Sequence, residues 1–267
     1  MFLESQIGSI YYDVRGPVDA PAIMFLHGVA MDHRTFDAQV AALEDRYRVI
    51  VMDMPCHGRS AHLGKTTSYA RATADLAMAL LDELGIQQAV LAGLSLGSFV
   101  VQHAAHAYPE RVTAMVQISS GSLHPGYSPL FQLLMPFTWL TIKALPMGMV
   151  KRSFAQHKAL LEETRAYLRE TTVQTGKDAI IYVTNEMTKD LVRGLPEPPT
   201  QPSLIVYGDH DLRFIQHMSI LWHERQPNSR LVEVPNAHHI LNQDNPEPFH
   251  RALREFLDEV TASRIAS

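Results

Sequence analysis

Gly93-Leu94-Ser95-Leu96-Gly97 is the stretch that decides the fold. It follows an apolar run at residues 88–92 and opens a second apolar stretch at residues 98–107. This order predicts a strand, a sharp turn at the serine and a helix, because the two glycines let the strand and helix backbones approach closely. The hydroxyl of Ser95 would stand at the end of a sheet, beside N–H groups of the helix start that favour negative charge.

Strand-like and helical runs alternate on both sides of this motif. We expect strands at residues 1–5, 8–14, 22–26, 47–52, 88–92, 112–119, 203–207 and 230–234, and helices at residues 36–43, 69–84, 98–108 and 246–260. The first two strands read as an antiparallel hairpin. The remaining alternation predicts an α/β fold with a mostly parallel sheet flanked by helices, and ligands of such sheets bind at the carboxyl ends of the strands.

The alternation stops between residues 121 and 202. This stretch contains helical segments separated by prolines, ends in the proline-rich segment 195–202, and shows no convincing buried strand. We therefore expect a core domain made of residues 1–120 and 203–267, with a helical cap, residues 121–202, inserted after the sixth strand. Such an insertion would lie over the serine turn.

Composition and charge narrow the class of partner. The 267 residues are 46% hydrophobic and carry a net charge of −5, without a basic face for nucleic acid or an anionic membrane. The single cysteine, Cys56, excludes an internal disulfide framework, and the N-terminal residues do not resemble a secretory signal. We expect a soluble, cytoplasmic protein that binds a small molecule and neither nucleic acid nor membrane. The sequence gives no oligomeric state.

A serine hydroxyl needs a general base, and the base needs a group that orients it. Candidates follow the seventh and eighth predicted strands: Asp209 and Asp211 after the seventh, His238 and His239 after the eighth. The chain order is thus serine, acid, histidine, which chymotrypsin-like and subtilisin-like enzymes do not share.

These residues, together with two further motifs, resemble the α/β-hydrolase superfamily, close in layout to its small bacterial esterases and lactonases. His27-Gly28-Val29-Ala30 is similar to the family's oxyanion loop, and residues 53–60 are similar to the D-x-P-G-H-G-x-S turn, with Cys56 in place of a glycine. The resemblance covers residues 1–120 and 203–260. It implies an oxyanion hole formed by the backbone N–H groups of Val29 and Leu96, and histidines in both loops that hydrogen-bond backbone rather than exchange protons.

The resemblance also selects within the two candidate pairs. The family's acid usually stands three residues after the glycine that ends the seventh strand, which implies Asp211. Asp209 is the alternative acid, and a turn-capping role is the other interpretation of Asp209. The family's histidine is usually followed five residues later by an acid. His239 and Asp244 fit that spacing, and His238 stands where the family has glycine, a replacement that would strain the loop.

The resulting interpretation is a serine hydrolase that cleaves carboxylic esters through an acyl-enzyme, with Ser95, Asp211 and His239 as catalytic triad. Two alternatives stay open. One is a lactonase, because residues 27–39 together with 93–97 resemble the 3-oxoadipate enol-lactonases. The other is a ligand receptor that keeps the triad and turns over slowly. An aspartate nucleophile, as in haloalkane dehalogenases and epoxide hydrolases, is disfavoured by Ser95. Proline iminopeptidases and C–C hydrolases are disfavoured by Val29-Ala30-Met31.

The predicted cap would set the substrate through its apolar side chains. The candidate pocket residues are Phe131, Met135, Phe137 and Trp139. No H-E-x-x-H, clustered Cys/His or phosphate-binding glycine-rich motif occurs in the sequence, so we expect neither a metal nor another cofactor.

Overall fold

Eight strands form one sheet in the computed structural model, which describes residues 1–64, 66–126 and 139–265. The strands are β1 (Phe2–Ser5), β2 (Gly8–Arg15), β3 (Ala22–Leu26), β4 (Arg48–Met52), β5 (Ala89–Leu94), β6 (Val112–Ile118), β7 (Ser203–Gly208) and β8 (Ser229–Val234). Their order is β1-β2-β4-β3-β5-β6-β7-β8. β1 and β2 form the expected antiparallel hairpin, β2 pairs antiparallel with β4, and the remaining neighbours are parallel.

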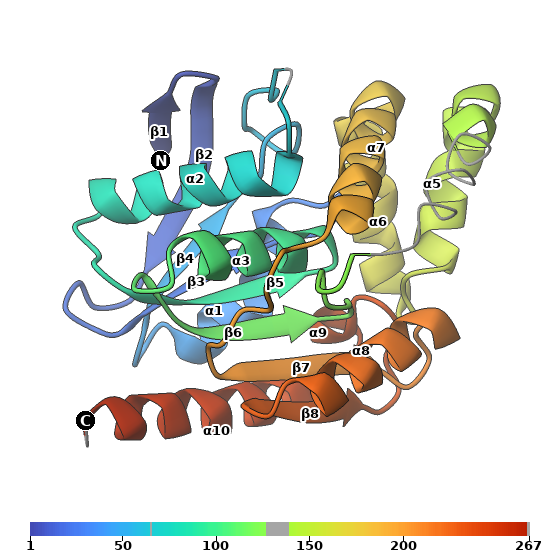
Figure 1. The fold of residues 1–267 in the computed structure, drawn as a ribbon. Helices are drawn as coiled ribbons and strands as arrows, with labels where there is room; N and C mark the ends of the chain where they lie inside the picture. Colours follow the sequence, from blue (N-terminus) through green and yellow to red (C-terminus); the bar gives the residue numbers. More distant parts are fainter. Residues whose placement is uncertain (65, 127–138, 266–267) are drawn as a thin grey trace.

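Helices cover both faces of this sheet (Figure 1). The helices of the structure, including those at one end of the sheet, are the short 3-10 helix η1 (His33–Phe36), α1 (Asp37–Leu43), α2 (Tyr69–Glu83), α3 (Leu96–Ala107), α5 (Met147–Gln156), α6 (Glu162–Thr175), α7 (Lys177–Arg193), α8 (Arg213–Arg225), α9 (Leu241–Asp244) and α10 (Pro246–Ile265). The predicted α/β fold with a mostly parallel, helix-flanked sheet is confirmed.

The side chains of β3 alternate between two buried clusters, one on each face of the sheet. Met24 and Leu26 belong to the cluster that contains α2 and α3, and Ile23 and Phe25 belong to the cluster that contains α1 and α10. All residues of β3 are buried. A continuous apolar run is what a strand covered on both faces requires, which is why the sequence of β3 lacks polar alternation.

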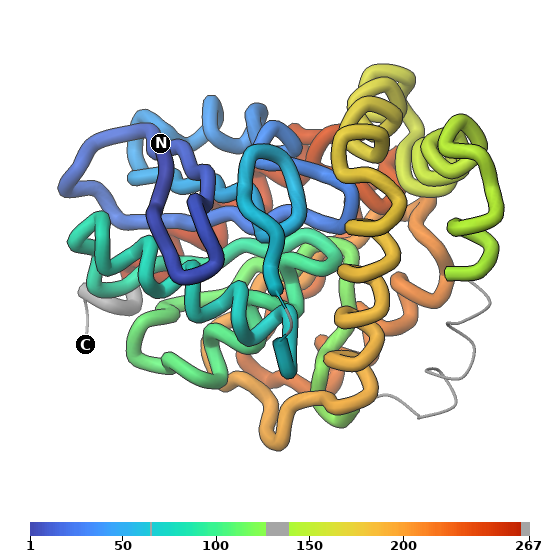
Figure 2. The backbone as a smooth tube through the Cα atoms, turned by 90° about the horizontal axis from the view of Figure 1, so that it is seen from above, coloured from blue at the N-terminus to red at the C-terminus, as the bar shows by residue number. Residues whose placement is uncertain are grey.

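Helices α5, α6 and α7 lie between β6 and β7, where the sequence predicts an insertion. Figures 1 and 2 show them together at one end of the sheet, the end toward which β6 points. From here on they are called the inserted helices. The described residues between 121 and 202 include no strand. Their status as a separate cap domain, with boundaries at residues 121 and 202, stays a prediction.

The inserted helices are hydrogen-bonded to the core, at the loop that contains Asp32 and at the first turn of α2. The hydroxyl of Tyr167 on α6 accepts a hydrogen bond from the Asp32 N–H at 3.0 Å and donates to the Asp32 carbonyl at 3.1 Å. Asp190 on α7 accepts a hydrogen bond from the backbone N–H of Ala70 at 3.0 Å.

No helix among the described residues is long and apolar enough to cross a membrane.

Candidate active site

Ser95 is the single residue between β5 and α3. Its backbone has φ 53° and ψ −111°, a conformation that is strained for a residue with a side chain. The turn is held in place because the Ser95 N–H donates to the Ile118 carbonyl, at the end of β6, at 2.9 Å. The hydroxyl therefore occupies a turn whose geometry costs free energy and is imposed by both neighbouring strands.

Gly93 and Gly97 are required by the close packing around this turn. A Cβ atom on Gly93 would lie 2.3 Å from the carbonyl carbon of Gly97, and a Cβ atom on Gly97 would lie 2.0 Å from the carbonyl oxygen of Leu26. Both distances are far below van der Waals contact. These contacts bring the start of α3 against the end of β3, which is followed by the loop that contains Val29.

Leu96 is the first residue of α3, and the first N–H groups of a helix have no partner within the helix. They and the helix dipole favour negative charge beside Ser95. Val29 is buried in the loop that follows β3. The structure thus places the two sequence-predicted N–H groups, those of Val29 and Leu96, in adjacent segments at the carboxyl ends of β3 and β5.

Asp211 and His239 lie together, as the sequence predicts. Both carboxylate oxygens of Asp211 are 3.2 Å from Nδ1 of His239, and both residues are buried. Burial raises the pKa of the Asp211 carboxyl, but the neighbouring His239 and hydrogen bonds to the carboxylate outweigh burial, so that the net pKa is lowered. An ionised Asp211 accepts only, so Nδ1 of His239 donates and Nε2 is left as the base.

Asp209 has other partners. Its Oδ1 accepts hydrogen bonds from Nδ1 of His210 at 2.7 Å and from the backbone N–H of Ala237 at 3.0 Å. These contacts join the loop after β7 to the loop after β8. The structure therefore gives Asp209 contacts within and between the loops, whereas Asp211 contacts the candidate base, His239.

His238 replaces a glycine of the resembled family without a left-handed backbone. The non-glycine residues with positive φ among those described are Ala30, Cys56, Ser95, Ser119 and Asn236. The expectation that His238 strains the loop is therefore wrong. Instead, its N–H donates to Asp244 at 3.0 Å and its Nδ1 accepts the N–H of His239 at 2.8 Å, which fixes the loop.

His27 and His57 hydrogen-bond the loops in which they lie. Nε2 of His27 accepts the Met54 N–H at 2.9 Å, so its Nδ1 donates to the Gly28 carbonyl at 2.8 Å. Nδ1 of His57 donates to the Pro55 carbonyl at 3.0 Å. Burial lowers the pKa of both histidines, to about 3 for His57. Both are neutral at pH 7 and connect backbone segments.

Cys56 has the backbone conformation of the glycine it replaces, with φ 70°. It is buried, and burial raises the pKa of its thiol. Because a thiol attacks as the thiolate, these surroundings make Cys56 a packed side chain and a poor nucleophile.

A cavity of about 170 Å³ opens at Ser95. Besides Ser95, it is lined by Phe99, Ser119, Ser120, Gly121, Met187, Thr188, Leu191, Phe214, Ile215 and Met218. Sequence reasoning missed the apolar lining from α7 and α8. A signal was present in Phe214, Ile215 and Met218, which follow Asp211 closely and share one face of a helix.

Among the described residues that line this cavity, none is one of the four pocket residues predicted from the sequence. Phe131, Met135 and Phe137 lie outside the described residues. Trp139 is described, and its indole N–H is buried, but it is not among the described residues that line the cavity at Ser95.

A second cavity, of about 300 Å³, lies on the His239 side. Its wall is formed by Ser153, Phe154, His157, Lys158, Leu212, Ile215 and His239. Ile215 lines both cavities, so the two are neighbours. The cavity at Ser95 is called the serine-side cavity from here on, and the one lined by His239 is called the histidine-side cavity.

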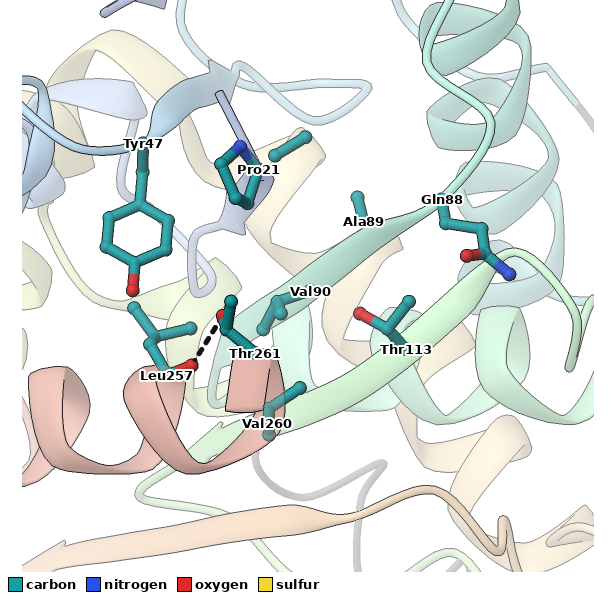
Figure 3. A pocket seen from close by; sticks show the side chains of 10 residues that line it. Pro21, Tyr47, Gln88, Ala89, Val90, Thr113, Leu257, Val260 and Thr261 are labelled. Atoms are coloured by element: carbon teal, nitrogen blue, oxygen red, sulfur yellow. Dashed lines mark hydrogen bonds between the residues drawn. The ribbon is translucent and has the colours of Figure 1, made fainter. Parts of the chain in front are cut away.

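Another hollow, of about 280 Å³, lies at the opposite end of the sheet, where β3, β5 and β6 begin (Figure 3). The hydroxyl of Thr261 beside it donates to the Leu257 carbonyl within α10. Ligands of parallel sheets bind at the carboxyl ends of the strands, where Ser95, Asp211 and His239 lie. The candidate site is therefore the pair of cavities at that end.

Comparison with known proteins places the chain in a family. The model of a family described as "Alpha/beta hydrolase family" matches residues 23–252. This range spans the sequence from β3 into α10 and includes every residue of the candidate triad.

Individual proteins resemble the chain more distantly. A pimeloyl-[acyl-carrier protein] methyl ester esterase of Aeromonas hydrophila is 27% identical over 257 residues, which cover 89% of this chain and 95% of that protein. The 3-oxoadipate enol-lactonase 1 of Acinetobacter baylyi is 34% identical over 97 residues, 36% of each chain. The crystal structure of the enol-lactonase from Burkholderia xenovorans LB400 superposes with a TM-score of 0.81 at 21% identity, covering 97% of this chain and 100% of that one.

Proposed function

The chain belongs to the alpha/beta hydrolase family, and on that premise we propose that it is a serine hydrolase that cleaves carboxylic esters of small molecules. Ser95 is the nucleophile, His239 the general base and Asp211 the group that orients it. The observation that carries the proposal is the contact between Asp211 and His239, at the same end of the sheet as the strained turn of Ser95.

In the first half of the reaction, the Ser95 hydroxyl attacks the ester carbonyl carbon and Nε2 of His239 takes the hydroxyl proton. The resulting imidazolium is stabilised by the Asp211 carboxylate, which holds the ring through Nδ1. When the tetrahedral intermediate collapses, the bond from the carbonyl carbon to the alcohol oxygen breaks and His239 gives its proton to that oxygen. The alcohol leaves and the acyl group stays on Ser95.

The negative charge on the tetrahedral oxygen is stabilised by hydrogen bonds that the N–H groups of Val29 and Leu96 donate to it. Leu96 supplies this group as the first residue of α3, and the helix dipole adds to its effect. Water then attacks the acyl-enzyme with His239 again as base. The products are a carboxylic acid and an alcohol, and Ser95 regains its proton.

The apolar serine-side cavity supports a substrate with an apolar portion of limited size. Its volume, about 170 Å³, is small compared with the usual range of drug-binding pockets. The methionines Met187 and Met218 in its wall are adaptable side chains. Short acyl groups fit this description better than long fatty acyl chains.

A lactonase is the second candidate. It is favoured by the local similarity to the enol-lactonase of Acinetobacter baylyi, which covers 36% of the chain. The chemistry differs only in that the alcohol stays attached to the acyl group after ring opening. Slow, receptor-like turnover is the remaining alternative.

Steady-state kinetics with p-nitrophenyl acetate, p-nitrophenyl butyrate and a five-membered lactone distinguish these three functions. An esterase turns over both p-nitrophenyl esters many times per active site, whereas a receptor releases at most about one equivalent of nitrophenol rapidly. A lactonase gives a higher kcat/KM for the lactone. Ser95→Ala should abolish each activity, and Ser122→Ala, which does not line either cavity, should retain it.

A further inference from the structure

Lys158 lines the histidine-side cavity together with His239. It follows α5 and is the one lysine among the described residues that line this cavity. It is half-buried, and its ammonium lies 4.8 Å from the centre of the Phe154 ring. A cation thus stands in the wall of the cavity that the proposed general base also lines.

The backbone around Lys158 is anchored to the histidine loop. The Lys158 carbonyl accepts the N–H of Ile240, the residue after His239, at 3.1 Å. The N–H groups of Leu160 and Leu161 donate to the Asp244 carboxylate at 3.0 to 3.1 Å, and the same carboxylate accepts the His238 N–H. These hydrogen bonds fix the backbone of Lys158 relative to the loop that contains His239.

The charge of Lys158 has no acidic partner in ion-pair distance among the described residues. Carboxylates pair with Arg and Lys side chains elsewhere, for example Glu186 with Lys189 at 2.6 Å. Residues 65, 127–138 and 266–267, which the structure does not describe, contain no Asp or Glu side chain. The nearby Asp211 acts on Lys158 through its charge, but its oxygens are bonded to His239.

A half-buried cation without a partner costs free energy, and an anion that enters the cavity would recover it. Burial lowers the pKa of the Lys158 ammonium to about 8. At pH 7 the group therefore still carries its charge in most molecules. The aromatic ring of Phe154 supports the cation without neutralising it.

We propose that Lys158 binds an anionic group of the substrate, and that the protein prefers esters or lactones that carry a carboxylate. This inference rests on the proposed function. Because Ile215 lines both cavities, they are neighbours, and a substrate whose carbonyl lies at Ser95 can place an apolar portion in one cavity and a charged portion in the other. The carboxylate can belong to the alcohol portion or to the acyl portion, and these two sources call for separate substrates.

Two pairs of esters test the proposal, each pair differing only in whether a carboxylate is free or methylated. The first pair, 4-acetoxybenzoate and methyl 4-acetoxybenzoate, carries the charge on the alcohol portion. The second pair, monomethyl glutarate and dimethyl glutarate, carries it on the acyl portion. For at least one pair, the wild-type protein should give a higher kcat/KM for the charged ester. Lys158→Met should lower that value by roughly 10- to 100-fold, because a charge-assisted contact is lost.

The neutral ester of the same pair should change less than threefold in Lys158→Met, and Lys158→Arg should retain part of the preference because it keeps the charge. Lys143→Met is the control for net charge, since Lys143 is exposed and lines neither cavity. Thermal melting of each variant excludes loss of fold.

Equal losses on the charged and neutral esters of both pairs, or no loss on either, would overturn the role of Lys158. A wild-type protein that hydrolyses none of the four esters, nor the p-nitrophenyl esters, would instead contradict the proposed function itself. The two failures are therefore distinguishable.

Discussion

Both carboxylate oxygens of Asp211 lie 3.2 Å from Nδ1 of His239. Asp209, two residues earlier, bonds His210 and the backbone of Ala237 instead. Substitution of the two aspartates should therefore have different effects on activity. Asp211→Asn should lower kcat for p-nitrophenyl butyrate by about 10⁴, because an amide can hold the imidazole in the wrong tautomer. Asp209→Asn should lower kcat by less than about tenfold while reducing thermal stability, because it weakens a contact between two loops.

Steady-state kinetics gives kcat for both variants, and melting curves give their thermal stability. A larger catalytic loss in Asp209→Asn than in Asp211→Asn would mean that the acid of the triad is assigned to the wrong residue.

Gly97→Ala should destroy the serine turn, because the new Cβ would lie 2.0 Å from the Leu26 carbonyl oxygen. We expect loss of activity together with a fall in unfolding free energy of several kcal/mol, or failure to fold. Gly148→Ala is the matched control. It lies in α5, has no described atom within 4 Å of the new Cβ, and should stabilise by about 0.4 to 1 kcal/mol. Urea unfolding measures both, and a Gly97→Ala protein as stable as wild type would show that the turn is not packed as described.

The strands were predictable because each buried strand, such as β3, is a short apolar run bounded by turn residues. The serine turn and the Asp211 and His239 positions follow from local spacing, and the structure brings the latter two together. Helix α8 was missed. The pattern for it was present, because the apolar residues of this segment recur at helical spacing: Phe214, Ile215, Met218, Leu221 and Trp222.

The cavity walls could not be predicted from the sequence because they combine segments far apart in the chain. Met187 on α7 and Met218 on α8 meet at Ser95 only through the packing of the inserted helices on the core. Lys158 illustrates the same limit. A lone lysine in a sequence usually indicates a surface charge. Its place near His239 follows from the hydrogen bond of its carbonyl to the Ile240 N–H and from the backbone contacts of the next residues with the Asp244 carboxylate, which no local pattern encodes.

Acid should destabilise the protein through His57, whose pKa is lowered to about 3 by burial from an ordinary value of 6.5. Below pH 6.5 the unfolded chain binds a proton that the folded state does not bind, so stability falls as pH decreases toward 3. For this one histidine the loss between pH 7 and pH 5 is about 2 kcal/mol. Nε2 of His57 has no hydrogen-bond partner within the described part of the chain, which is why protonation there is unfavourable.

Urea unfolding at pH 7 and pH 5 measures this effect in the wild-type protein and in His57→Asn. The difference between the two pH values should shrink by about 2 kcal/mol in the variant. Because each protein is compared with itself, any constant change in stability cancels. An unchanged difference would mean that His57 already binds a proton in the folded state.

The serine-side cavity predicts how activity depends on acyl length. For p-nitrophenyl esters, kcat/KM should rise by up to about fourfold for each added methylene until the cavity of about 170 Å³ is filled, and then fall. Met187→Ala and Met218→Ala should move the optimum to longer acyl groups, because they remove side chains from the wall. Met149→Ala, at an exposed position on α5, should leave the optimum in place. A length profile that neither cavity variant alters would place the acyl group elsewhere.

Covalent labelling can identify the nucleophile, which we assign to Ser95. The protein should be treated with a fluorophosphonate, digested, and analysed by mass spectrometry to locate the modified residue. We expect one phosphonylated residue, Ser95, with loss of esterase activity in proportion to labelling, and no labelling of Ser95→Ala. Inactivation accompanied by modification of any other residue, or esterase activity that persists in Ser95→Ala at more than about one thousandth of wild type, would contradict it.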